Sequence, residues 1–188
     1  GGGCARSLSA SGDGLRSWLG SIIASHGGVI AEPWLERVMD FSALYEMKPG
    51  QVDLVGMTRI ENDAMGRFRG ISVAPRWSKL LGEEVAHFLF SQEQVMQWYG
   101  EKIPEALAGL LPGYAGPLGV DAMVYRRPDG TLALRHVIEL NVRMTMGRVA
   151  LELQRKLAPA GWGAFRVLRK TDAVKEGSIL LNDPQHAG

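Results

Sequence analysis

The 188-residue sequence predicts an α+β fold in which an antiparallel sheet is flanked by helices. Strand-like and helix-like segments are grouped along the chain rather than strictly alternating, which favours α+β over a doubly wound sheet. Short turn sequences join several neighbouring strand-like segments, as in an antiparallel meander. Apolar residues make up 46% and charged residues 22%, so the chain is ordinary for a globular protein with one well-buried domain, or one domain with a small appendage.

The first expected element is a helix that faces a core. Its apolar residues recur at helical spacing at Leu15, Trp18, Leu19, Ile22 and Ile23. The small-residue turn 9–14 precedes it, and His26-Gly27-Gly28 ends it. A short strand over Val29–Glu32 should then stop at Pro33.

The next group consists of three strands, over residues 41–46, 52–60 and 67–73. The turn Lys48-Pro49-Gly50-Gln51 joins the first two, because proline and glycine there favour a reversal.

A helical stretch follows, over 83–90 and then from Ser91, a candidate N-cap, to Leu111. Pro104 fits poorly inside one long helix, so we expect a break near Lys102.

The last group is a hairpin, a helix and a strand. The hairpin should pair 117–126 with 133–140 around the turn Arg127-Pro128-Asp129-Gly130. The closing elements should be a helix over 147–157 and a strand over 164–169.

Charge and cysteine content narrow the functional classes. A net charge of +1 gives no support for a nucleic-acid or membrane surface, so a small molecule is the expected partner. The chain has no apolar run of about 20 residues and no basic-then-apolar leader. The single cysteine, Cys4, fits a reducing compartment, and we expect a cytoplasmic protein.

The strongest chemical signal lies at the end of the predicted hairpin. Glu139 and Asn141 are two residues apart and should share one strand face, with Arg143 beside them, while Asp121 lies on the neighbouring strand. Carboxylate and amide oxygens suit magnesium. The alternative is a solvated sheet face with a cross-strand ion pair, although acids within such apolar strands need a partner.

Three weaker signals could belong to the same site. The turn 9–14 before a helix could cradle phosphate, or could simply cap the helix. The segment Glu32–Leu35, followed by Asp40, could hold a flat base and a ribose, or could be a strand-loop-strand with Trp34 and Leu35 in the core. Arg67 and Arg69 could reach a triphosphate, or could protect a strand edge.

Taken in order, these motifs resemble the ATP-grasp superfamily of ATP-dependent carboxylate–amine ligases. The resemblance runs from about Ala5 to Val149 and rests on a glycine loop, E-P-W-L, D-F-S, G-V-D-A and E-L-N-V-R, of which the last is the most specific. It implies an ATP-grasp-like fold, with part of a lid region over 1–35 and the catalytic region over 36–188.

The resemblance also implies a role for each motif. ATP phosphates would contact the glycine loop at Ser11, Gly12 and Gly14. Apart from the resemblance, the spacing of Arg67 and Arg69 on one strand face makes Arg69 a further candidate to reach a triphosphate or an acidic substrate. The backbone of Glu32, Pro33, Trp34 and Leu35 would hold adenine, and Asp40 would hold the ribose. Magnesium or manganese would bind Asp121, Glu139 and Asn141, and Arg143 would stabilise the transferring phosphoryl group.

The implied function is Mg-ATP-dependent activation of a small carboxylate as an acyl phosphate, which an amine then attacks. Family members usually carry a phosphate-binding lysine before the glycine loop, where this sequence has Ala5 with Arg6 adjacent. They also carry an N-terminal domain that completes the substrate site, which could be supplied by a longer chain. The alternatives are therefore a nucleotide-binding module or fragment without catalysis, and a structural α+β domain that binds no nucleotide.

Overall fold

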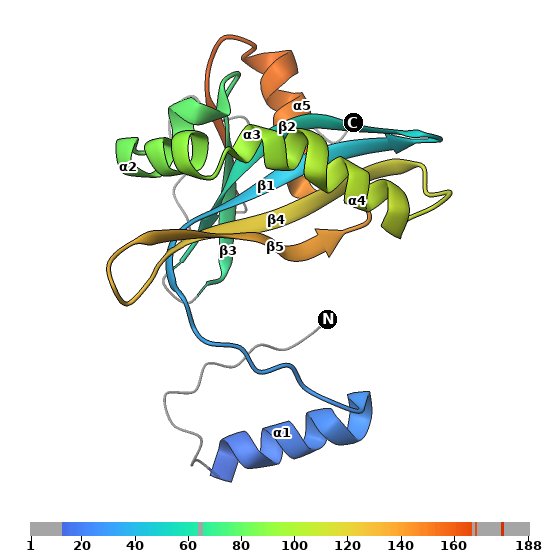
Figure 1. Ribbon diagram of the computed structural model, residues 1–188, viewed down its shortest axis with the longest axis vertical. Helices are drawn as coiled ribbons and strands as arrows, with labels where there is room; N and C mark the ends of the chain where they lie inside the picture. Colours follow the sequence, from blue (N-terminus) through green and yellow to red (C-terminus); the bar gives the residue numbers. More distant parts are fainter. Residues whose placement is uncertain (1–12, 64–65, 167, 169–177, 179–188) are drawn as a thin grey trace.

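The computed structural model describes residues 13–63, 66–166, 168 and 178, and it shows an α+β protein built on one antiparallel sheet (Figure 1). The six strands lie in the order β5-β4-β1-β2-β3-β6. Their bounds are β1 (Glu36–Lys48), β2 (Gln51–Asn62), β3 (Phe68–Val73), β4 (Gly116–Arg126), β5 (Leu132–Asn141) and β6 (Gly163–Arg166). The sheet is open, with β5 and β6 at its edges. The predicted α+β class is confirmed.

Helices pack on both faces of the sheet. One face is covered by a layer of short helical segments: η1 (Trp77–Leu80), α2 (Glu83–His87), η2 (Phe88–Gln92), α3 (Val95–Gln97), η3 (Trp98–Lys102) and α4 (Ile103–Leu110). The opposite face carries α5 (Met146–Leu157), which follows β5. Figure 1 shows the helical layer in green in front of the strands and α5, in orange, behind them.

Alternation along β1 builds two cores of different size. Phe41, Ala43 and Tyr45 point to the helical layer, where the Tyr45 hydroxyl donates to the Tyr99 carbonyl at 2.8 Å. Leu44 points the other way, into a smaller cluster with Leu151 of α5. Beyond that cluster, the α5 face of β1 carries polar side chains, which form the candidate site described below.

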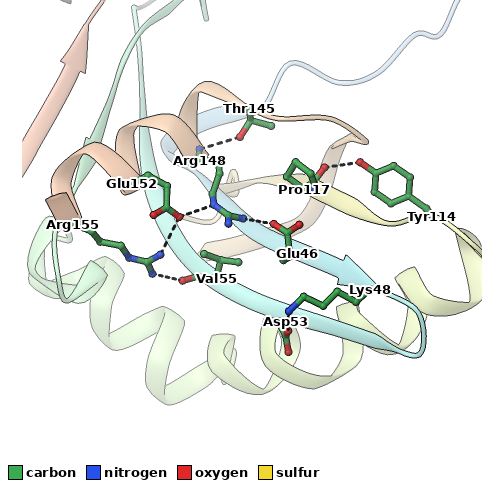
Figure 2. Close-up of polar contacts among 10 residues, drawn as sticks. All are labelled: Glu46, Lys48, Asp53, Val55, Tyr114, Pro117, Thr145, Arg148, Glu152 and Arg155. Atoms are coloured by element: carbon green, nitrogen blue, oxygen red, sulfur yellow. Dashed lines mark hydrogen bonds and ion pairs between the residues drawn. The ribbon is translucent and has the colours of Figure 1, made fainter.

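Polar contacts fix α5 along its length (Figure 2). The Thr145 hydroxyl caps the helix by accepting from the Arg148 amide at 3.3 Å. Arg148 bridges Glu46 of β1, at 3.0 Å, and Glu152 on the next turn, at 2.8 Å. Arg155 donates to the Val55 carbonyl of β2 at 2.7 Å. The helix is therefore tied to the two central strands through three turns.

Two expectations for the N-terminal part are wrong. The helix α1 (Asp13–His26) forms, but none of its residues is buried, so it does not face a core. Residues 29–35 are not a strand. Instead, β1 begins at Glu36, earlier than expected. The sequence did not indicate this start, because residues 39–45 are all buried and a central strand covered on both faces shows no alternation of apolar and polar residues.

The helical layer also differs from expectation. Ser91 is not an N-cap, since it lies inside η2, where the helix widens to π-type hydrogen bonding. The chain reverses at Gln94 in the left-handed conformation, with φ 49°, before α3. Near Lys102 the backbone stays helical, and Pro104 lies in the first turn of α4. In place of the expected break, the chain changes from π-helix in η3 to α-helix in α4.

The remaining expectations are confirmed, and, apart from the end of the last strand, the observed ends lie within two residues of the expected ones. Both turns form, with Gly50 and Gly130 at positive φ, and the hairpin pairs β4 with β5. The predicted β2, β3 and α5 form at 51–62, 68–73 and 146–157. The last strand, β6, is described over 163–166, and residues 167 and 169 lie outside the described part.

Candidate functional site

Polar side chains from three adjacent strands share the face of the sheet that α5 partly covers. The register places Ser42 of β1 opposite Asp121 of β4, and Asp121 opposite Glu139 of β5. Gly119, two residues before Asp121, lies opposite Asn141. Residues directly opposite each other in an antiparallel pair point to the same face. The predicted grouping of Asp121, Glu139 and Asn141 is therefore what the structure contains; we call this set, with Ser42, the polar face.

A chain of hydrogen bonds orders the polar face. The Asn141 amide nitrogen donates to Asp121 Oδ2 at 3.1 Å, and Arg143 Nη2 donates to Asn141 Oδ1 at 2.8 Å. Asn141 is buried, whereas Arg143 lies just beyond the end of β5 and reaches back to it. The strand does not continue to Arg143, but its guanidinium still joins the group.

The electrostatics of Asp121 favour a cation. Burial raises the pKa of Asp121 above its usual value, and the Glu139 and Asp40 carboxylates raise it further, while Ser42 and Asn141 oppose the rise. Within the described residues neither Asp121 nor Glu139 has a cationic side chain at ion-pair distance. The cross-strand ion pair considered from the sequence is thus not formed there.

Asp40 lies two residues before Ser42 on β1, on the same face. It is 6% exposed, and its Oδ2 accepts from Arg37 Nη1 at 2.7 Å and from Asn62 Nδ2 at 2.5 Å. Its Oδ1 is buried and has no hydrogen-bond partner in the described part of the chain. Burial raises the pKa of Asp40, against the opposing effects of Arg37 and Asn62. The free oxygen is suited to a donor from a ligand.

A cavity of about 630 Å³ opens beside Asp40. Its walls come from the segment that leads into β1, the start of β1 and the end of β2, and they include Trp34, Leu35, Asn62 and Gly66. This volume is within the range of small-molecule sites. Asn62 is a site residue that the sequence did not indicate. Its role depends on the pairing of Asp40 with Ile60, which places the end of β2 beside Asp40.

Other predicted site residues lie apart from the polar face. Gly14 is in the first turn of α1, and a Cβ built there would contact nothing within 4 Å. Ser11 and Gly12 lie outside the described residues. The Glu32 carboxylate forms an ion pair with Arg135 of β5, and Pro33 is in the same extended segment. Arg69 pairs with Asp63 at 3.3 Å.

The donor set fits a magnesium-type ion better than a softer metal. No three histidine, cysteine or acidic side chains converge within the described ranges. Two carboxylates and an amide, however, match magnesium or manganese, which commonly bind through one or two carboxylates while keeping water and substrate phosphates as the other ligands. Manganese is accepted by the same oxygens.

His136 lies on the side of β5 that faces the helical layer. Its ring packs on the helical layer, 4.2 Å from the Trp98 ring centre, and burial lowers its pKa. It therefore has no part in the polar face.

Comparison with known proteins adds no family assignment. No protein-family model matches the sequence, and no curated protein matches it significantly. None of the helices described here is long and apolar enough to cross a membrane.

Proposed function

We propose that the polar face and the adjoining cavity bind Mg-ATP and that the chain is an ATP-grasp-type carboxylate–amine ligase. One observation carries the proposal: the Asp121–Glu139–Asn141 set and the Asp40 cavity lie on the same sheet face, joined by consecutive same-face residues of β1. A metal-type donor set beside an open cavity with an unsatisfied carboxylate oxygen suits a nucleotide with its phosphates at the metal end.

Each end of the site has a matching part of the ligand. The base would lie in the cavity against Trp34 and Leu35, and a ribose hydroxyl would donate to Asp40 Oδ1. The phosphates would extend past Ser42 towards Asp121 and Glu139. Asp121, Glu139 and Asn141 would hold magnesium, which would supply positive charge to offset that of the phosphates.

The chemistry requires positioning rather than a protein nucleophile. A carboxylate oxygen of the substrate attacks the γ-phosphorus of ATP, the bond to the β-phosphate oxygen breaks, and ADP leaves. An amine nitrogen then attacks the acyl carbon, inorganic phosphate leaves, and the nitrogen loses a proton. Arg143 supplies a charge for the transferring group once its guanidinium leaves Asn141 Oδ1, which frees that oxygen as a ligand.

Calorimetric titration with ATP, with and without magnesium, tests the binding step. We expect magnesium-dependent binding by the wild type and its loss, by at least about tenfold, in Glu139→Ala, because a carboxylate ligand is removed. Glu101→Ala, an exposed acid in the helical layer, is the matched control and should bind like the wild type. Binding that is indifferent to magnesium would overturn the proposal.

A nucleotide-binding module without turnover is the second candidate. The sequence favours it at one place, where Ala5 occupies the register of the family's phosphate-binding lysine and only Arg6 is adjacent. Phosphate release measured across a panel of carboxylates and amines separates the two. Magnesium-dependent binding without release in any combination would support the module.

A further inference from the structure

A second cavity, of about 560 Å³, lies along the outer edge of β2. β3 pairs with β2 only from Arg59 to Asn62 and ends at Val73. Among the described residues, no strand pairs with the outer edge of residues 54–57 of β2. The cavity occupies this place, between η1 and η2 on one side and the C-terminal half of α5 on the other.

The walls of this edge cavity are largely apolar. Trp77, Phe90 and Met96 contribute from the helical layer and Leu151 from α5. Phe90 is 37% and Met96 50% exposed, so apolar surface is left open to solvent. Gly56 lets α5 approach, because a Cβ there would lie 2.7 Å from Leu151 Cδ2.

The polar residues that line the edge cavity are Trp77, Ser78, Gln154 and Arg155, and the donors of Trp77 and Arg155 favour an acceptor on the ligand. The Trp77 side chain is buried, and its Nε1–H has no hydrogen-bond partner in the described part of the molecule. Among the described residues that line the cavity, Arg155 is the only charged one, and its side chain is 46% exposed. Its Nη2 donates to the Val55 carbonyl, and its Nη1 donates to Glu152 Oε1 at 3.3 Å. The Trp77 and Arg155 groups are both donors, and none of the described lining residues is acidic.

We propose that the edge cavity binds a small organic anion with an aromatic or branched apolar body and a carboxylate. The apolar body would cover Phe90 and Met96, where burial of apolar area favours binding. The carboxylate would meet the Arg155 guanidinium at N–H groups other than the two that donate to Val55 and Glu152, since a guanidinium carries five donors. An acceptor atom of the ligand would satisfy the Trp77 indole, which is otherwise a buried donor without a partner.

The site is separate from the proposed nucleotide site. None of its lining residues belongs to the cavity beside Asp40 or to the polar face. Its occupancy can therefore be tested without ATP, and a failure of either proposal leaves the other standing.

Phenylacetate is a suitable probe, with phenylacetamide as its uncharged counterpart. In nitrogen–proton correlation spectra of the full chain, millimolar phenylacetate should shift one indole signal, and that signal should be missing in Trp77→Phe. The phenyl ring at 77 keeps the aromatic contacts with Phe41 and Phe90 while removing the donor.

Substitution of the rim charge gives an independent test. Arg155→Gln should weaken phenylacetate binding by about tenfold or more, since a charge-assisted pair is lost, and should leave phenylacetamide binding unchanged. Lys156→Gln removes the same charge one residue away, at an exposed position that does not line the cavity, and should bind like the wild type. The proposal is overturned if phenylacetate leaves the Trp77 signal in place, or if Arg155→Gln binds it as the wild type does.

Discussion

At the scale of single residues, Asp121 is a carboxyl group whose surroundings oppose its charge. Because burial raises its pKa in the folded state, folding favours the protonated form. The stability that this contributes is fully present below the unfolded value near 3.8, and it is lost as the pH rises through the folded-state pKa. At neutral pH the burial of Asp121 therefore lowers the free energy of unfolding of the free protein.

Asp121→Asn should remove that penalty. We expect a higher free energy of unfolding than the wild type at pH 7, and a smaller difference at pH 4, as measured by urea denaturation. The amide can still accept from Asn141. Asp53→Asn, near the turn between β1 and β2, serves as the control. An equal difference between wild type and Asp121→Asn at both pH values would contradict the prediction.

Magnesium should offset the same penalty without any nucleotide. A cation held by Asp121 and Glu139 binds the folded state only, so it should raise the thermal midpoint of the wild type at pH 7. The rise should be smaller in Asp121→Asn. Sodium chloride at matched ionic strength controls for screening, and an equal response to both salts would rule out a specific site.

Asn62 shows what the sequence could not reveal about the site. Asp121, Glu139 and Asn141 were predictable because two residues apart on one strand means one face, and the hairpin turn identified their neighbouring strands. Asn62 belongs to the site only through the pairing of β1 with β2, which shifts register between Leu44 and Tyr45. A bulge of that kind leaves no reliable signal in the sequence.

The functional value of Asn62 can be measured directly. Asn62→Ala removes one of the two donors that orient Asp40, so ATP affinity should fall by about tenfold in calorimetry. Gln51→Ala removes a comparable side chain at the other end of β2, where it bonds to Asp53, and should leave ATP affinity unchanged. If the two variants bound ATP with equal affinity, Asn62 would have no role in ATP binding.

At the scale of elements, the start of α5 packs against β4, one of the strands that carry the polar face. Its cap residue, Thr145, packs so closely that a Cβ on Gly119 would lie 3.0 Å from Thr145 Cγ2. Thr145→Ala should lower the free energy of unfolding by about 1 kcal/mol, through loss of the cap. Thr145→Ser keeps the hydroxyl and should retain most of that stability in the same urea experiment. If serine were as destabilising as alanine, methyl packing rather than capping would hold the helix start.

The helical layer has details of backbone conformation that local sequence signals do not predict. The sequence predicted a helical stretch over this region, and helices form there with their apolar side chains buried against β1. The π-type turns of η2 and η3 and the left-handed Gln94 were not predictable. These features depend on tertiary packing, because Leu89, Val95 and Tyr99 must all be buried against the sheet.

At the scale of the whole molecule, the two longest helices have opposite relations to the sheet. Both α1 and α5 have apolar residues at helical spacing, and the sequence predicted that α1 would face a core. Only α5 does, and α1 lies away from the strands in Figure 1 with no buried residue. Periodicity identifies an apolar face but carries no information on what covers it.

Substitution of the two apolar faces should therefore have unequal effects on folding. Leu151→Ala opens a gap between α5 and Leu44 and should cost about 2–5 kcal/mol in the free energy of unfolding. The double variant Trp18→Ala/Leu19→Ala should change it by less than about 0.5 kcal/mol, because neither side chain is buried. Urea denaturation followed by circular dichroism measures both. A loss in the double variant comparable to that of Leu151→Ala would mean that α1 packs on the sheet in solution, and the polar face would then be covered from a second side.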